Sequence, residues 1–83
     1  NKMKITNNIE EVKRGTYAIV AQLNSGTSIT LSISVNDGAF INIEDGAFTA
    51  DATKIIELPN CKIKGVSVGG SFVDLETIES GIR

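Results

Sequence analysis

The side chains that most often carry enzymatic chemistry are scarce in this chain of 83 residues. It contains no histidine and a single cysteine, Cys61. Without histidine it cannot form a Ser-His-Asp or Cys-His triad, and one cysteine forms neither a disulfide within the chain nor a zinc site of several thiolates. Lys62 and Lys64 lie close enough in sequence to activate the Cys61 thiol, but we interpret Cys61 as a small apolar residue of a strand.

The ten carboxylates are the remaining groups that could act on a substrate or bind a metal. A glycosidase uses two carboxylates on either side of a bound sugar, and a domain of this size has little material to build a deep cleft. Calcium prefers oxygen ligands, but the acidic residues in and near the turns lack the spacing of an EF-hand loop; they are Asp37, Glu44, Asp45 and Asp51. We therefore expect a protein that is not an enzyme, with no catalytic residue, no metal and no cofactor.

Charge and hydrophobicity argue against two further classes of partner. Eight Lys and Arg residues against ten Asp and Glu residues give a net charge of −2, whereas binding to nucleic acid needs clustered basic residues. The longest purely apolar run, residues 18–21, is far shorter than the roughly 20 residues of a helix that crosses a bilayer. We expect neither nucleic-acid binding nor membrane insertion.

The composition favours strands over helices. The chain has 12 isoleucines, 6 valines and 7 threonines against only 4 leucines. These β-branched side chains are restricted in helices and pack well on a pleated sheet. The eight glycines are spread along the chain singly or in pairs, as expected for turn residues between short strands.

Residues 28–35 show the clearest strand pattern, in which apolar residues alternate with small hydroxyl residues. The apolar face would comprise Ile29, Leu31, Ile33 and Val35, and the hydroxyl face Ser28, Thr30, Ser32 and Ser34. Further strands are predicted at residues 16–23, 39–43, 47–50, 53–58, 61–68 and 71–78. Their spacing predicts an all-β fold, a small antiparallel β-sandwich or barrel of six to seven short strands.

Three local signals refine this prediction. Asn36-Asp37-Gly38 is typical of a tight hairpin, because these residues tolerate positive φ. Glu44-Asp45-Gly46 is predicted as a second turn, since Asp-Gly-Ala-Phe recurs there after eight residues. The apolar positions change parity at Gly65, which predicts a β-bulge at that glycine.

Residues 1–15 resemble a strand least and leave two readings open. Asn8 could cap a short helix that ends at Gly15, with Glu11 completing a capping box. Alternatively, the segment is an extended arm that leads into the first strand. We therefore divide the chain into an N-terminal arm or short helix, residues 1–15, and a single β-sandwich domain, residues 16–83.

Two groups of residues are candidates for contact with a partner. The hydroxyl face of residues 28–34 could pair with a second sheet, or could simply be solvated. Phe40 and Phe48 could form an exposed aromatic surface, or could close the ends of the sandwich. Because the core contains only one Tyr, three Phe and no Trp, we expect self-association to contribute to stability.

The stretch of residues 26–68 resembles small structural proteins of tailed-phage virions. The similar segment is SVNDGAFINIEDGAFTADATKIIELPNCKIKGV, with two Asp-Gly turns, a Leu-Pro-Asn sequence and a closing strand. Such proteins include capsid decoration, head-fibre and tail-attachment domains, which are often trimeric and carry no catalytic residues. The resemblance covers about half of the chain.

The resemblance implies a role in assembly. We expect a non-enzymatic structural protein of a phage virion that binds capsid or fibre proteins, stabilises the particle and forms a homo-oligomer, with a trimer favoured. It would be found in the virion, and in the host cytoplasm during assembly. The alternative is a ligand-binding or glycan-binding β-module displayed on a phage or bacterial surface, for which the chain offers few aromatic residues.

Overall fold

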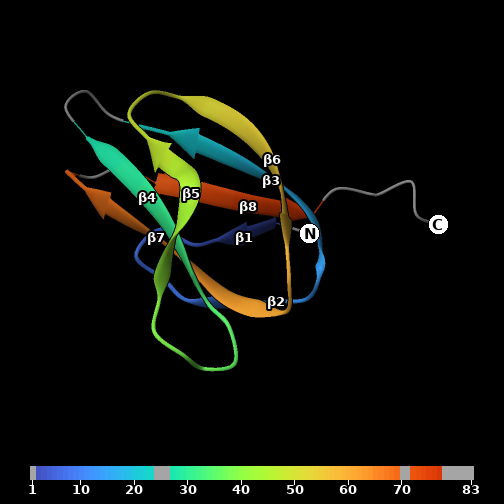
Figure 1. Ribbon diagram of the computed structural model, residues 1–83. Helices are drawn as coiled ribbons and strands as arrows, with labels where there is room; N and C mark the ends of the chain where they lie inside the picture. Colours follow the sequence, from blue (N-terminus) through green and yellow to red (C-terminus); the bar gives the residue numbers. More distant parts are fainter. Residues whose placement is uncertain (1, 24–26, 70–71, 78–83) are drawn as a thin grey trace.

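The structure is a computed structural model that describes residues 2–23, 27–69 and 72–77; for residues 2 and 72–77 it describes the backbone (Figure 1). The described residues form eight strands and no helix, so the prediction of an all-β fold is confirmed. The strands are β1 (Lys2–Lys4), β2 (Glu10–Val12), β3 (Gly15–Gln22), β4 (Ser28–Ser34), β5 (Ile41–Phe48), β6 (Ala52–Leu58), β7 (Cys61–Val68) and β8 (Phe72–Thr77).

The strands form two antiparallel sheets of four strands each. The first sheet has the order β1-β8-β3-β6, and the second has the order β2-β7-β4-β5. Their facing sides enclose one apolar core, as in a small sandwich. The core residues are Ile5, Val12, Tyr17, Ile19, Ala21, Ile29, Leu31, Phe48, Leu58, Cys61 and Ile63.

The two sheets are joined by one long, bent pair of strands. β2 continues into β3 through residues 13–14, and β6 continues into β7 through residues 59–60. At this corner the antiparallel pair β2–β7 of the second sheet becomes the pair β3–β6 of the first (Figure 1). The register continues through the bend, because Val12 pairs with Cys61 on one side and Gly15 pairs with Leu58 on the other. This corner couples the two sheets by backbone pairing as well as by the core.

The N-terminal segment forms strands, so the predicted short helix is wrong. β1 pairs with β8 in the first sheet, and β2 pairs with β7 in the second. Ile5, between them, is fully buried, and its carbonyl accepts the N–H of Gly65 at 2.8 Å. The capping signals at Asn8 and Glu11 are outweighed by this pairing, since a two-turn helix has little stability of its own.

The segment Glu44-Asp45-Gly46 is a bulge within β5, so the second predicted turn is also wrong. Thr30 pairs with Ala47 and Ser32 pairs with Asn42, which leaves residues 43–46 opposite Leu31 alone. Asp45 does adopt positive φ, at 61°. The chain nevertheless continues in the same direction, because both ends of β5 pair with β4.

The predicted bulge at Gly65 does not form. β7 pairs with β4 in an unbroken register from Lys62 opposite Ser34 to Val68 opposite Ser28. Gly65 is buried on the core side, and the change of parity instead leaves Val66 and Val68 exposed on the outer face. The space above Gly65 is occupied by the backbone of the segment around Ile5.

Candidate functional site

β5 forms one edge of the second sheet, and the connection from β4, residues 35–40, contains a tight turn. Asn36 and Asp37 both adopt positive φ, at 57° and 60°, and the N–H of Gly38 donates to the carbonyl of Val35 at 3.1 Å. The positive φ that the sequence predicts here is confirmed, but the strands do not close on this turn, because Ile33 pairs with Ile41. The Ser34 hydroxyl donates to the Gly38 carbonyl at 2.7 Å and ties the returning chain to β4.

The apolar face of β4 extends beyond the cover of the opposite sheet. Ile29 and Leu31 are 1% and 0% exposed, Ile33 is half-buried, and Val35, just after β4, is 43% exposed. Figure 1 shows the hairpin that follows (green) projecting from the end of the sandwich. The side chains that were predicted to lie in the core therefore reach the surface at this end.

An apolar hollow of about 410 Å³ lies next to this end of β4 and β5. Ile41, which pairs with Ile33, is 65% exposed. The lining is Ile33, Val35, Ala39, Ile41, Asn42, Ile43 and Glu44. Exposed apolar side chains gathered in one place are typical of a contact surface.

Within the described residues, β5 pairs on one side only. β1, β2 and β6 are edge strands as well, but β1 and β2 are three residues long, and very short edges are poor templates for a further strand. β6 carries the charged residues Lys54 and Glu57. The part of β5 before its bulge, residues 41–42, thus combines an open backbone edge with the exposed apolar side chain of Ile41.

The outer side of the same edge carries an aromatic ring and a cation. The ammonium of Lys64 lies 4.3 Å from the centre of the Phe40 ring, a distance typical of a cation–π contact. Lys64 pairs with Ser32, which pairs in turn with Asn42 of β5. Lys64 therefore shares a face of the sheet with Ser32 and Asn42, whereas Ile33 and Ile41 belong to the other face.

The predicted contact residues differ in how far they are exposed in the structure. Ser28 and Thr30 are half-buried, whereas Ser32 and Ser34 are each only 3% exposed. Phe40 is half-buried at the β5 edge, and Phe48 belongs to the core. Sequence reasoning missed Ile41 and Val35 as surface residues, because their alternation with polar neighbours indicates a core face.

Ser32 and Ser34 allow a matched test of buried hydroxyl groups. The Ser32 hydroxyl has no hydrogen-bond partner in the part of the chain that the structure describes, whereas the Ser34 hydroxyl donates to Gly38. We expect Ser32→Ala to leave the free energy of unfolding unchanged or to raise it, and Ser34→Ala to lower it by about 1 kcal/mol. Urea denaturation measures both. Equal losses would contradict this difference between the two sites.

An ion pair joins the hairpin to β7. The ammonium of Lys62 lies 2.8 Å from a carboxylate oxygen of Asp37. The hydrogen bond from Lys62, and then its charge, lower the pKa of Asp37, while the same contacts raise the pKa of Lys62. Both side chains are well exposed, so this pair contributes little to stability and is screened by salt.

The pKa of Asp37 tests this ion pair directly. We expect Lys62→Met to raise it toward the ordinary value of about 3.9, as measured by carboxyl carbon NMR during an acid titration. Because the folded-state pKa is lowered, the pair stabilises the fold above the unfolded pKa and this contribution is lost as the pH falls through the folded pKa. Lys54→Met serves as the control, and an unchanged Asp37 pKa in Lys62→Met would contradict the pairing.

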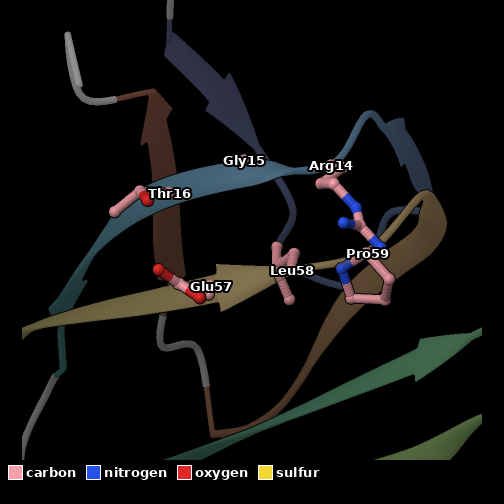
Figure 2. Close-up of a pocket in the computed structure, with 6 residues that line it drawn as sticks. All are labelled: Arg14, Gly15, Thr16, Glu57, Leu58 and Pro59. Atoms are coloured by element: carbon pink, nitrogen blue, oxygen red, sulfur yellow. The ribbon is translucent and has the colours of Figure 1, made fainter. Parts of the chain in front are cut away.

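A second pocket, of about 420 Å³, lies at the corner where β3 meets β6 (Figure 2). Figure 2 shows the Arg14 side chain alongside the ring of Pro59, with Glu57 and Thr16 projecting from the neighbouring strands. The backbone N–H of Arg14 donates to the side chain of Asn60 at 2.7 Å, which holds the corner. One cation and one carboxylate line this pocket, without the paired carboxylates of a glycosidase, so we do not place the functional site here.

The other chemical candidates have ordinary structural positions. Cys61 is buried in the core, and burial raises the pKa of its thiol, which disfavours the reactive thiolate. Among the described residues, no group of three or more His, Cys, Asp or Glu side chains is placed to hold a metal ion. The same residues include no helix of the length and hydrophobicity needed to cross a membrane.

Three comparisons with known proteins found no relative of this chain. The chain matches no protein-family model, no curated protein and no solved structure.

Proposed function

We propose that this chain is a non-enzymatic assembly domain that binds another protein through the exposed edge of β5. The observation that carries the proposal is the combination of an unpaired strand edge, residues 41–42, with the apolar hollow beside it. Backbone groups at a sheet edge bind an extended strand of a partner, and the neighbouring side chains select its sequence.

The setting that we propose is the phage virion, where the domain binds capsid or fibre proteins. This part of the proposal is supported by the sequence resemblance of residues 26–68. Several exposed apolar side chains fit a protein that is covered by neighbours in an assembly: Ile9, Val35, Ile41, Ile55, Val66 and Val68 are 43–66% exposed.

The alternative, a glycan-binding module, has less support. Such sites stack sugar rings on exposed aromatic faces. Tyr17 and Phe48 are buried, the Tyr17 hydroxyl donates to the Lys13 carbonyl at 2.6 Å, and the Phe40 ring faces the Lys64 ammonium. The described aromatic rings thus leave little surface for a sugar, and we favour the assembly function.

A photo-crosslinking experiment tests the proposal. Benzoylphenylalanine is placed at position 41 or at position 55, whose isoleucines are 65% and 66% exposed, and virus-like particles are banded from cultures of the organism that encodes the chain. We expect the chain to band with the particles and position 41, but not position 55, to crosslink to a particle protein. Absence of the chain from the particles would contradict the virion setting, and equal crosslinking at both positions would contradict the β5 edge.

A further inference from the structure

We infer that the partner segment bound at the β5 edge presents a large apolar side chain to the hollow and a lysine or arginine to Glu44. This inference rests on the proposed function, because that proposal places the binding surface at β5. It adds the chemical class of the partner, an extended basic segment with one apolar anchor. The backbone of the segment would pair with residues 41–42, the part of β5 before the bulge.

The hollow beside β5 is suited to an apolar anchor. Its lining is apolar apart from Asn42 and Glu44, and its volume of about 410 Å³ leaves room for a large side chain. Ile41 and Val35, on its wall, are 65% and 43% exposed. The cores of protein interfaces are rich in aromatic residues and methionine, and such a side chain in the hollow would remove the apolar surface of Ile41 and Val35 from water.

Glu44 is the one charged residue among those that line this hollow. It is exposed, and it forms no ion pair within the part of the chain that the structure describes. The lysines of this region contact other groups: Lys54, Lys62 and Lys64 contact the Asp45 carbonyl, the Asp37 carboxylate and the Phe40 ring, in this order. A cation for Glu44 would therefore come from the partner.

Asp45 adds a second negative charge beside Glu44. It is exposed and lines a neighbouring hollow of about 480 Å³, which shares Asn42 and Ile43 with the first. Lys54 also lines this second hollow, so the two carboxylates and one ammonium leave this stretch of the edge with a net negative charge. Complementary charge attracts a partner and like charge repels it, so the edge favours a basic segment over an acidic one.

Selection from a displayed library of randomised peptides, with the whole chain as bait, tests this inference. The enriched peptides should share a large apolar residue and a lysine or arginine near it. We expect Glu44→Lys to weaken their binding about twofold to fivefold, the effect of one exposed ion pair, and an acidic residue in place of the basic one to restore it. Glu57→Lys, which alters an exposed glutamate of the β6 edge, is the control and should bind as the unmodified chain does.

Binding of the same peptides to Ile41→Lys separates this inference from the proposed function. Peptides that need Ile41 but carry no basic residue, or that bind Glu44→Lys as well as the unmodified chain, would overturn the inference and leave the β5 edge as the binding surface. Peptides that bind Ile41→Lys undiminished would contradict the β5 edge itself. A library that yields no enriched peptide would overturn the inference, while crosslinking at position 41 would still decide the proposed function.

Discussion

Replacing Ile5 with alanine is expected to lower the free energy of unfolding by about 2–5 kcal/mol, as for other fully buried large apolar residues. Ile5 is 0% exposed and lies between β1 of one sheet and β2 of the other. Its carbonyl accepts the N–H of Gly65, and the N–H of Asn7 donates to the Gly65 carbonyl at 2.6 Å. These bonds hold the segment in place, so the neighbouring core cannot easily fill the cavity that alanine would leave.

Urea denaturation measures this effect, and Ile9→Ala provides the control. Ile9 lies in the same N-terminal segment but is 52% exposed, so its replacement should change stability by less than about 0.5 kcal/mol. Ile5→Val is the milder variant if Ile5→Ala does not fold, with an expected loss of about 1 kcal/mol. Similar small effects at Ile5 and Ile9 would mean that residues 2–12 are a detachable arm.

Replacing Gly46 with alanine is expected to cost about 1–3 kcal/mol, through overpacking at the β5 bulge. A Cβ atom at this position would lie 2.9 Å from the Ile43 carbonyl oxygen, 3.0 Å from the Ile43 Cβ and 3.3 Å from the Leu31 Cβ. Two of these atoms belong to the bulge itself and the third to β4. The bulge would have to open, which would also disturb the β5 edge.

Gly65→Ala is the matched control for Gly46→Ala. Gly65 is buried as well, but a Cβ atom there would meet its nearest neighbours, in Ile29, Ile5 and Leu31, at 3.5 Å, an ordinary contact distance. We expect a clearly smaller loss of stability for Gly65→Ala, measured by urea denaturation under the same conditions. Equal losses at both glycines would show that the bulge is less tightly packed than its geometry indicates.

Local signals in the sequence predicted those parts of the fold that depend on neighbouring residues. The positive φ values of Asn36 and Asp37 follow from residue types that tolerate them. The residue type of Asp45 likewise agrees with its positive φ, but it does not indicate whether the chain reverses there. Whether the chain reverses there depends on the pairing of β5 with β4, which brings together residues on both sides of the bulge.

The candidate site could not be predicted, because it depends on how far one sheet covers the other. Ile41 and Val35 alternate with polar residues and read as core positions, yet both lie where the second sheet extends past the first. Ser32 shows the opposite case, since it reads as a surface residue but is buried on the outer face. At Gly65, the change in the alternation of apolar residues indicated a bulge. The structure instead packs the distant segment around Ile5 on this glycine.

We propose that the domain binds its protein partner through the edge of β5. Lysine at a strand edge prevents pairing with a further strand, and Ile41 and Ile55 can be replaced with similar effect on the fold because they are almost equally exposed, at 65% and 66%. The most direct measurement is the amount of the chain, of Ile41→Lys and of Ile55→Lys that bands with virus-like particles from cultures that express each of them at matched levels.

We predict that the unmodified chain and Ile55→Lys band with the particles, and that Ile41→Lys does not. Circular dichroism should show the same strand content in all three proteins, so that the loss of assembly is separated from unfolding. An Ile41→Lys variant that bands with the particles as well as the unmodified chain does, or a loss of assembly in Ile55→Lys alone, would contradict the proposal.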